Sequence, residues 1–482
     1  SLRTLEMLSY RIGFLLVLLL LCASFVISNS VNHRRILSLR HSTMDMDVRS
    51  AGVKTSYTQS WVDHDSRQTL YHQRYYVNRS YYKPGGPLLI YIGGEAPLSP
   101  NVIAAGEIVE TAKTHNGLLV ALEHRYYGES QPESSWDTAS LQYLTIEQAL
   151  SDLQDFQHFF YEENNLGLYK TKVICFGGSY PGSLSAFYHY SRPELTVAAL
   201  ASSAPVWARN DFYEYDQSIA ASVGSKTAQA IRLSTSAVTT RLYDNMSRVM
   251  DDFALGSLQQ PTVQSILYVL ADIIAFGVQY GQLAMVQSSF TSASASSSTL
   301  TPYEQYVAYA QVIRQQVGDL AEFDITAFRS TAVSFTDNMR QWMYQSCTQV
   351  GWFQVAPTHD SLRSPLINLE WHAKVCADLF GLQHLAETDA VNLRYGAKSM
   401  DKRTTQTIFV NGEEDPWKTM AITPQCRADV HSCEQQVDDN RLVLIADAAH
   451  CADLHAPSPK DSPNLIRARE WIATLLSQWL SA

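Results

Sequence analysis

Residues 173–182 are Val173-Ile174-Cys175-Phe176-Gly177-Gly178-Ser179-Tyr180-Pro181-Gly182. The apolar residues at the start predict a buried strand, the two glycines predict a tight turn, and a helix is expected to follow. In an α/β sheet such a turn lifts one hydroxyl above the edge of the sheet, which is the arrangement of a nucleophile elbow. We therefore predict that Ser179 is the nucleophile of a serine hydrolase. An acid and then a histidine should follow it in the chain.

One detail of this motif departs from the usual Gly-x-Ser-x-Gly pattern of an elbow. Pro181 stands where the last glycine is expected, and Gly182 follows it. Proline is tolerated in the first turn of a helix, because the N–H that it lacks would have no partner there. The elbow stays the prediction, but the departure counts against an ordinary lipase or esterase.

The predicted acid follows a late apolar strand at 405–410. This strand runs into a polar turn, Asn411-Gly412-Glu413-Glu414-Asp415-Pro416-Trp417. A serine hydroxyl is a poor nucleophile until a base takes its proton, and the base needs an acid to fix its tautomer. Asp415 is the preferred acid because the proline after it stiffens the turn. Glu413 and Glu414 compete with it for this role.

The predicted base follows the next apolar strand, at 442–445. The residues after it are Ala446-Asp447-Ala448-Ala449-His450-Cys451-Ala452-Asp453. His450 is preferred as the base because it is closer to the strand end, and His455 is the alternative. Serine, acid and histidine then follow one another in the chain order of α/β hydrolases, each after an apolar strand.

An oxyanion hole needs two N–H groups that point at the developing negative charge. The backbone N–H of Tyr180, directly after the nucleophile, is one predicted donor. The other is expected from the loop after the strand at 87–92, at Gly94 or Glu95. The phenol of Tyr180 is an alternative or additional donor.

The rest of the chain predicts an α/β fold of the α/β-hydrolase type. Apolar strands at 87–92, 117–122 and 197–201 alternate with helical patterns, which indicates a parallel sheet covered on both faces. From about 212 the strand runs give way to helical periodicity, and they return at 405. The predicted units are a signal peptide at 1–30, the first part of the hydrolase domain at 50–211, a mainly helical cap insertion at 212–385, and the second part of the hydrolase domain at 386–482.

The N-terminal segment has the pattern of a secretory signal. Arg11 precedes an apolar run at 12–27, and the small polar residues Ser28-Asn29-Ser30 follow it. The run is slightly shorter than a comfortable membrane span, so no stable span is expected after cleavage, with an uncleaved anchor as the alternative. The net charge of -11 and the lack of a basic run with interleaved aromatics exclude nucleic acid as a predicted partner.

Secretion favours disulfides and glycans. Without Cys22, six cysteines remain. Their economical local pairs are Cys347 with Cys376 and Cys426 with Cys433, although sequence alone does not fix connectivity.

Cys175 is expected to stay an unpaired thiol in a buried strand, and the state of Cys451 is open. Asn78 and Asn245 head glycosylation sequons. No Cys/His cluster has zinc spacing, so neither a metal nor a cofactor is predicted.

The chain resembles a known family, the proline-specific serine carboxypeptidases. This family includes lysosomal Pro-X carboxypeptidase, the lysosomal dipeptidyl peptidase that removes X-Pro dipeptides, and thymus-specific serine protease. The matching segments run in order from about residue 57 to the C-terminus. They are Gln73-Arg74-Tyr75 with Val77-Asn78, Gly93-Gly94-Glu95, Glu123-His124-Arg125-Tyr126-Tyr127-Gly128, Tyr143-Leu144-Thr145 with Glu147-Gln148-Ala149, Gly177-Gly178-Ser179-Tyr180, Ser202-Ser203-Ala204-Pro205-Val206, Tyr344-Gln345 with Cys347, Asn411-Gly412 with Asp415-Pro416-Trp417, and Ala449-His450.

The resemblance implies an α/β-hydrolase domain with a helical cap and a triad of Ser179, Asp415 and His450. It implies peptide substrates that contain proline, in a lysosomal, endosomal or extracellular compartment and often at acidic pH. Trp417 matches a residue of the family's apolar proline pocket, and Cys347–Cys376 matches a family disulfide. A homodimer is left open.

The chain shows no acidic disulfide loop before 342–344 such as the dipeptidyl peptidase branch carries. This difference favours a Pro-X carboxypeptidase-like or thymus-specific-protease-like enzyme, with an X-Pro dipeptidyl peptidase as the alternative. A small-ester hydrolase is a further alternative. The alternative of another class is a non-catalytic binding glycoprotein on a hydrolase scaffold.

Overall fold

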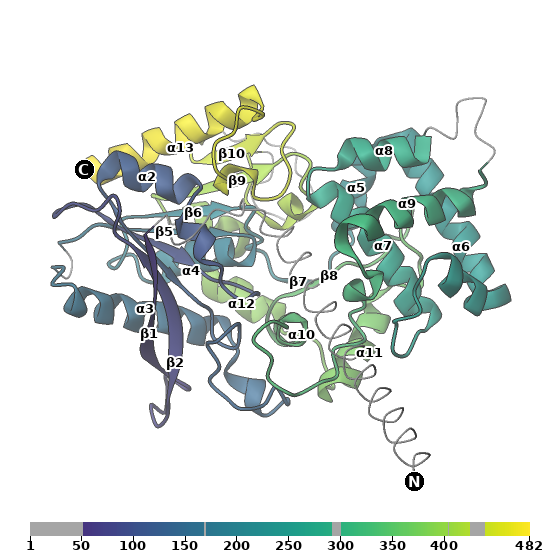
Figure 1. Ribbon diagram of the computed structural model, residues 1–482, viewed down its shortest axis with the longest axis horizontal. Coiled ribbons are helices and arrows are strands. Elements are labelled where there is room, and N and C mark those ends of the chain that lie inside the picture. Colours follow the sequence, from purple (N-terminus) through teal and green to yellow (C-terminus); the bar gives the residue numbers. More distant parts are fainter. Residues whose placement is uncertain (1–51, 168–169, 292–299, 403, 425–438) are drawn as a thin grey trace, which may run out of the picture.

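The computed structural model describes residues 52–482 apart from 168–169, 292–299, 403 and 425–438 (Figure 1). The predicted signal peptide at 1–30 and the predicted Cys426–Cys433 pair lie outside the described residues. Among the described residues no helix is long and apolar enough to cross a membrane.

An eight-stranded sheet forms the centre of the fold, in the order β1-β2-β4-β3-β5-β6-β9-β10. β2 runs antiparallel to both of its neighbours, and the six strands from β4 to β10 in this order are parallel. The predicted α/β-hydrolase fold is therefore confirmed, although the antiparallel pair at one edge was not predicted. The strands are β1 (Val53–Trp61), β2 (Leu70–Asn78), β3 (Leu88–Ile92), β4 (Leu118–Leu122), β5 (Val173–Gly178), β6 (Ala198–Ser202), β9 (Thr407–Gly412) and β10 (Leu442–Ile445).

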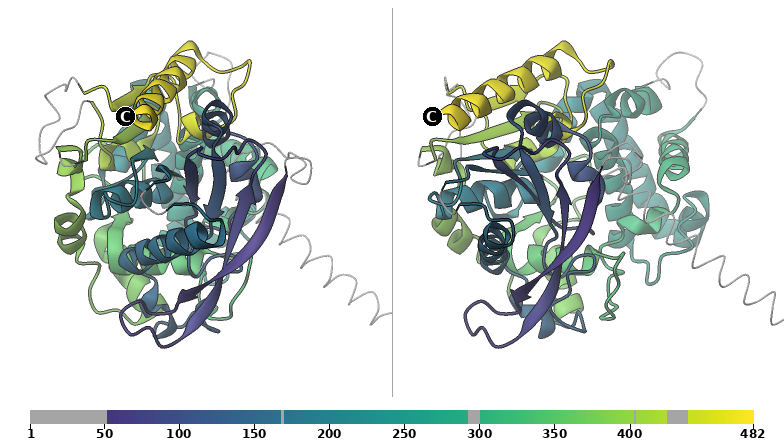
Figure 2. Two further views of the ribbon diagram at one scale, coloured as in Figure 1. Left: turned by 90° about the vertical axis from the view of Figure 1, so that its left-hand side faces the viewer. Right: turned by 60° about the vertical axis from the view of Figure 1, so that its left-hand side comes forward.

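Helices cover both faces of the sheet (Figures 1 and 2). Side chains alternate between the two faces of a strand. On β3, Leu88 and Ile90 pack in a core with α3 (Ile146–Glu163) and α4 (Tyr180–Ser191). Leu89, between them, packs in a second core with α2 (Glu107–His115) and α13 (Pro463–Ser481). Burial on both faces explains why the parallel strands are apolar throughout.

The segment between β6 and β9 is mainly helical, and most of it lies to the right of the sheet in Figure 1. β6 and β9 are nonetheless hydrogen-bonded neighbours, so this segment is an insertion between two adjacent strands. The boundaries at 212 and 385 stay predictions. Its helices are α5 (Glu214–Val223), α6 (Ser225–Asp252), α7 (Val263–Gln279), α8 (Leu283–Thr291), α9 (Pro302–Val317), α10 (Met339–Gln345), α11 (Leu369–Phe380) and α12 (Thr388–Tyr395).

Two details of the insertion differ from the sequence expectation. The helical pattern at 263–285 is broken after Gln279, because Gly281 adopts a φ of 74° and turns the chain from α7 into α8. A short strand, β8 (Gly351–Phe353), also lies within the region expected to lack strands, and it pairs in parallel with β7 (Arg209–Asp211), just before that region.

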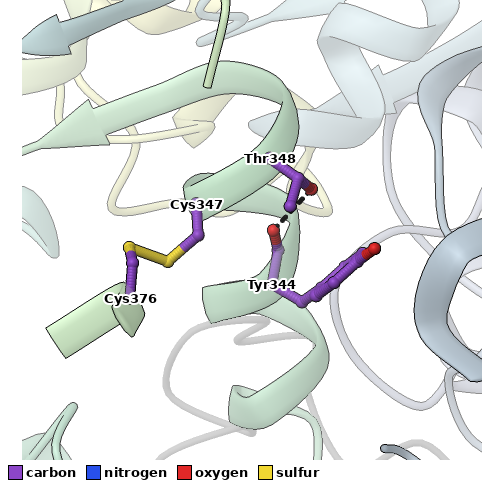
Figure 3. The surroundings of a disulfide bond; sticks show 4 residues. All are labelled: Tyr344, Cys347, Thr348 and Cys376. Atoms are coloured by element: carbon purple, nitrogen blue, oxygen red, sulfur yellow. Dashed lines mark hydrogen bonds between the residues drawn. A yellow bond between two sulfur atoms is a disulfide. The ribbon is translucent and has the colours of Figure 1, made fainter. Parts of the chain in front are cut away.

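A disulfide joins Cys347 to Cys376, as the sequence predicted (Figure 3). Cys347 lies in a short π-helix (Ser346–Val350) directly after α10, and Cys376 lies on α11, with a Cα–Cα distance of 5.7 Å. The bond therefore ties α10 to α11. Cys175 is a buried free thiol, and Cys451 is a half-buried one.

A buried ion pair braces the sheet against the chain segments around it. The guanidinium of Arg125 donates from Nε and Nη2 to the two carboxylate oxygens of Asp152, at 2.7 and 2.6 Å. Ser60 and Tyr71 also donate to Asp152. Both charges lie out of contact with solvent. Because every acceptor oxygen is used, the pair satisfies the conditions under which buried ions are tolerated.

Asp152→Asn is expected to lower the free energy of unfolding by about 3–5 kcal/mol, because it leaves the charge of Arg125 buried without a counter-ion. Urea denaturation of the wild type and the variant measures this loss. Asp378→Asn is the matched control, since Asp378 pairs with Lys374 on the exposed face of α11. The control should change stability by less than about 1 kcal/mol. Equal losses in the two variants would contradict the bracing role.

Candidate active site

The predicted elbow has the expected geometry. β5 ends at Gly178, Ser179 adopts φ 63° and ψ -133°, and α4 begins at Tyr180. A positive φ is uncommon for a residue with a side chain and is kept where the surroundings enforce it. The backbone N–H of Ser179 donates to the carbonyl of Ser202 on β6 at 2.9 Å. The neighbouring strand therefore holds the turn in place.

Gly182 explains the departure from the usual elbow pattern. A Cβ at Gly182 would lie 2.8 Å from the carbonyl oxygen of Ser202 and 3.0 Å from that of Gly177, so only glycine fits between β6 and the elbow. Pro181, in the expected glycine position, points its ring at Gly94, where a Cβ would overlap with it. The glycine that lets the elbow and β6 approach each other closely therefore stands one residue later than in the usual pattern.

Asp415 and His450 form a buried pair. Asp415 caps the short 3-10 helix Pro416–Met420, where its Oδ1 accepts from the backbone N–H of Trp417 at 3.0 Å. Its Oδ2 lies 2.7 Å from Nδ1 of His450. Since a carboxylate accepts, Nδ1 carries the hydrogen and Nε2 is left as the basic nitrogen.

The competing residues from the sequence do not take part in this pair. Glu413 is exposed and Glu414 is half-buried, whereas the side chain of Asp415 is fully buried. Among the described residues, the carboxylate in contact with the His450 ring is that of Asp415. His455, the alternative base, lies farther along the loop than His450, and burial lowers its pKa.

The electrostatics of His450 follow from these neighbours. Burial by itself lowers the pKa of His450, but the charge and hydrogen bond of Asp415 raise it, and the net shift is upward from 6.5. The backbone holds the ring in place, because the N–H of His450 donates to the carbonyl of Gln279 on α7 at 3.1 Å. An imidazole with a stabilised cation is a suitable proton acceptor for a serine hydroxyl.

Ser179 and His450 line the same cavity. A Cβ at Gly178 would lie 2.9 Å from the Sγ of Cys451, so the loop that carries His450 packs directly on the elbow. The structure thus brings together the three residues that the sequence singled out, with Asp415 behind His450. Within the described ranges, no group of three His, Cys, Asp or Glu residues has an arrangement that would hold a metal ion.

The phenol of Tyr180 is occupied by other partners. Burial lowers the pKa of His124 to about 4, so this ring is neutral. Its Nδ1 faces the carbonyl of Arg125 at 2.8 Å and carries the hydrogen, so its Nε2 accepts from the Tyr180 hydroxyl at 3.2 Å. Gln345 donates to the same hydroxyl at 2.8 Å. With its proton directed at His124, the phenol does not serve as an oxyanion donor.

Backbone donors are the remaining candidates for the oxyanion hole. Tyr180 opens α4, so its N–H has no partner inside the helix. Glu95 lines the cavity, and Gly94 next to it packs against Pro181. The roles of Tyr180, Gly94 and Glu95 in the oxyanion hole stay predictions.

Aromatic side chains form one wall of the cavity beside Ser179 and His450. Trp417 is half-buried, and its ring centroid lies 5.3–5.8 Å from those of Phe212, Tyr215 and Trp352. Trp352 continues to Trp342 at 6.1 Å. Such a wall suits an apolar ring that offers no N–H.

Sequence reasoning missed Gln279, the last residue of α7. Its Oε1 accepts from Nε1 of Trp417 at 3.0 Å and from the hydroxyl of Tyr215 at 2.8 Å, while its carbonyl accepts from His450. One glutamine therefore fixes both the aromatic wall and the histidine loop. A polar residue at the end of an apolar helix was the only signal in the sequence, and it does not show which loops the helix meets.

The two predicted glycosylation sites differ in exposure. Asn78 is buried in β2, where its Nδ2 donates to the carbonyl of Ile103 at 2.8 Å and its Oδ1 accepts from the N–H of Ser80. The fold leaves no room for a glycan on this side chain, which argues against the Asn78 prediction. Asn245 is exposed at a kink in α6, and its glycosylation stays a prediction.

A model of the serine carboxypeptidase S28 family matches residues 62–472. The chain belongs to this family. It is therefore a serine peptidase, and the family resemblance predicted from the sequence is confirmed.

Curated relatives cover most of both chains. The chain is 33% identical over 432 residues to the probable serine protease EDA2 of Arabidopsis thaliana, covering 85% of this chain and 84% of that protein. It is 30% identical to the thymus-specific serine protease of Mus musculus, covering 85% and 83%. It is 28% identical to the lysosomal Pro-X carboxypeptidase of Bos taurus, covering 97% of each chain.

Proposed function

We propose that this S28 serine peptidase is an exopeptidase that cleaves peptide bonds next to proline through Ser179, Asp415 and His450. The observation that carries the proposal is the 2.7 Å contact between Asp415 and His450 beside the strained turn of Ser179. This pairing of base and acid next to an activated hydroxyl is the arrangement that acyl transfer requires.

In the proposed reaction, Ser179 Oγ attacks the scissile carbonyl carbon while His450 Nε2 takes the hydroxyl proton. The carbonyl oxygen becomes an oxyanion, which the backbone N–H of Tyr180 and one N–H of the 94–95 loop are proposed to bind. When the C–N bond breaks, His450 returns the proton to the leaving amine, and the acyl group stays on Ser179. Water then repeats the sequence with His450 again as the base, releasing the acid and restoring the serine.

Specificity for proline is proposed to come from the aromatic wall at Trp417. The pyrrolidine ring offers no N–H and presents apolar carbons, so flat aromatic faces are its natural partners. The relatives named lysosomal Pro-X carboxypeptidase support this choice of substrate.

The exopeptidase mode has two candidates. The sequence favours a carboxypeptidase, which must accommodate the free carboxylate of its substrate. The second candidate is an X-Pro dipeptidyl peptidase, which must accommodate a free ammonium. One observation favours the second: among the described residues that line the cavity there is no lysine or arginine to meet a carboxylate.

The compartment is proposed to be the secretory pathway, with a lysosomal, endosomal or extracellular destination. Support comes from relatives named as lysosomal or thymus-specific proteases. Cleavage of the 1–30 segment and a homodimer stay predictions.

A mass-spectrometric cleavage profile on a mixed peptide library, at acidic and neutral pH, tests the proposed function. We expect cleavage only at peptide bonds adjacent to proline, and only near one terminus of each peptide. Hydrolysis of p-nitrophenyl esters without cleavage of prolyl peptides would instead indicate an esterase. Correctly folded protein that fails to react with a fluorophosphonate probe would indicate a binding protein.

A further inference from the structure

One face of α10 contacts both segments that are predicted to form the oxyanion hole. Asn338 stands directly before this helix, Trp342 lies on it, and Gln345 ends it. Their spacing of four and seven residues places the three side chains on the same side of the helix. This face contacts Glu95 at one end and Tyr180 at the other. A helix of the insertion therefore bridges two loops of the sheet domain.

Asn338 gives its side chain to the loop at 94–95. It is the N-cap residue of α10, where an asparagine normally accepts a hydrogen bond from an N–H of the first helical turn. Its side chain makes no such bond, and its Nδ2 donates instead to the carbonyl of Glu95. Because a peptide group is planar, a fixed carbonyl at Glu95 also fixes the plane of the peptide bond that follows. This contact restricts the loop that carries the second predicted donor.

Gln345 holds Tyr180 through a buried chain of hydrogen bonds. Its Nε2 donates to the Tyr180 hydroxyl at 2.8 Å, and its Oε1 accepts from the hydroxyl of Tyr127 at 2.5 Å. Tyr180 in turn donates to His124, and all four side chains are buried. Burial raises the pKa of the Tyr180 phenol, so the phenol keeps its proton and this direction of donation. A buried chain with its members paired favours one arrangement of the ring.

Gln345 reaches the cavity only through Tyr180. The described residues that line the cavity include Tyr180 but not Gln345. The ring of Trp342 also packs on that of Tyr180, with the centroids 5.6 Å apart. α10 thus contacts both the phenol and the ring of the residue whose backbone N–H is the first predicted donor.

The end of α10 that carries Gln345 is itself anchored. Cys347, two residues farther along the chain, is bonded to Cys376 on α11 (Figure 3). The disulfide limits how far this end of α10 can move relative to α11, and it limits the movement of the Gln345 side chain in the same way.

We propose that α10 is the positioning element of the oxyanion hole, with Asn338 fixing the 94–95 loop and Gln345 fixing Tyr180. The inference rests on the proposed function, in which one N–H from each of these two segments binds the oxyanion. The segments follow two different strands, β3 and β5, so their separation depends on what connects them. Donors stabilise an oxyanion when they already point at the place where the charge develops. Loss of either contact should therefore weaken binding of the transition state more than binding of the substrate.

The test uses the full chain with two variants and one control. Gln345→Leu removes the contact with the phenol while keeping a side chain of similar size. Asn338→Ser keeps a residue that is favourable at an N-cap, but its side chain is too short to reach the 94–95 loop. Gln341→Leu is the control, because Gln341 is a fully buried glutamine of the same helix whose Nε2 donates to the carbonyl of Tyr126 at 3.0 Å, outside the predicted oxyanion hole.

Three measurements separate a positioning role from a structural one. Steady-state kinetics on Ala-Pro-aminomethylcoumarin and on acetyl-Ala-Pro-Phe gives kcat and KM for either exopeptidase mode. The inhibition constant of a prolyl boronic acid reports on a tetrahedral adduct, because its boron takes up the oxygen of Ser179 and becomes negatively charged. The second-order rate constant of fluorophosphonate labelling reports on the same hole without a proline substrate, since Ser179 displaces fluoride while the phosphoryl oxygen gains charge.

We expect Gln345→Leu and Asn338→Ser each to lower kcat and the labelling rate about 10- to 100-fold and to weaken boronate binding by a similar factor. This loss is smaller than the about 10²- to 10³-fold typical of removing an oxyanion donor, because the donors are displaced and not deleted. KM should stay within about threefold, since the aromatic wall is kept. Gln341→Leu should keep all of these values within about threefold, even where urea denaturation shows that it is as destabilised as Gln345→Leu.

Values within about threefold of the wild type in both folded variants would overturn the inference. An equal catalytic loss in Gln341→Leu, or a loss confined to KM, would overturn it as well. A loss in only one of the two variants would keep the inference for that half of the oxyanion hole and remove it for the other half. If Gln345→Leu does not fold, Asn338→Ser decides by the same criteria.

Failure of the proposed function gives a different result. Wild-type protein that reacts with fluorophosphonate but cleaves neither prolyl substrate would overturn the proposed function. The labelling rates of the variants would still decide the role of α10, because they depend on Ser179 and the oxyanion hole and not on proline.

Discussion

Ser179→Ala is expected to lower kcat on prolyl peptides by about 10⁵- to 10⁶-fold, because the variant loses the only atom that forms the acyl-enzyme. KM should change little, since the aromatic wall and the rest of the cavity stay in place. The residual rate comes from binding and the oxyanion hole acting on water. Steady-state kinetics on an X-Pro amide measures the loss, and fluorophosphonate labelling should disappear with it.

Ser185→Ala is the matched control for this experiment. Ser185 lies on the same helix, is fully buried, and has a hydroxyl without a hydrogen-bond partner. Removal of this hydroxyl should leave both labelling and turnover within about twofold of the wild type, because the loss of a buried hydroxyl without a partner changes stability little. Full turnover by Ser179→Ala would overturn the assignment of the nucleophile.

The central sheet was predictable because its strands are buried on both faces. Residues 88–92 and 118–122 are apolar without interruption, which is the pattern of a parallel strand covered by helices on both faces. β1 and β2 were missed for the opposite reason. In β2, outward residues such as His72 alternate with buried ones such as Tyr71, so the strand lacks the continuous apolar run that marks the central strands.

The meeting of Asp415 with His450 beside Ser179 was predictable because each of the three residues follows a strand, and strand ends meet at one edge of a parallel sheet. The contacts of Gln279 were not predictable in this way. This residue comes from α7, whose contacts with the sheet domain depend on how the insertion folds back over the elbow. A helix pattern shows which face is buried but not which partner it meets. Asn78 shows the same limit, since a sequon does not reveal that its asparagine is buried.

Asp415→Asn is expected to lower kcat by about 10⁴-fold while the geometry of the site is kept. The amide of asparagine offers an N–H as well as a carbonyl, so Nδ1 of His450 no longer has to carry the hydrogen and Nε2 is no longer reliably the base. The stabilisation of the imidazolium is lost as well. The kcat on an X-Pro amide measures the loss. A crystal or solution structure of the variant checks that the fold is unchanged.

The pH profile gives this variant a second, independent readout. Catalysis requires neutral His450, so kcat/KM falls as the pH is lowered through its pKa. The carboxylate of Asp415 raises that pKa in the wild type. Its removal should therefore shift the acid limb of the profile to lower pH, even as the whole curve drops.

Glu413→Gln is the control for the acid assignment, because this exposed carboxylate stands two residues away and was a competitor for the role. It should keep kcat within about twofold and leave the acid limb in place, as expected for an exposed charge screened by solvent. A large loss in Glu413→Gln, or an acid limb that does not move in Asp415→Asn, would show that another group orients His450. The burial of Asp415 and its 2.7 Å contact with Nδ1 are the reasons to expect the opposite.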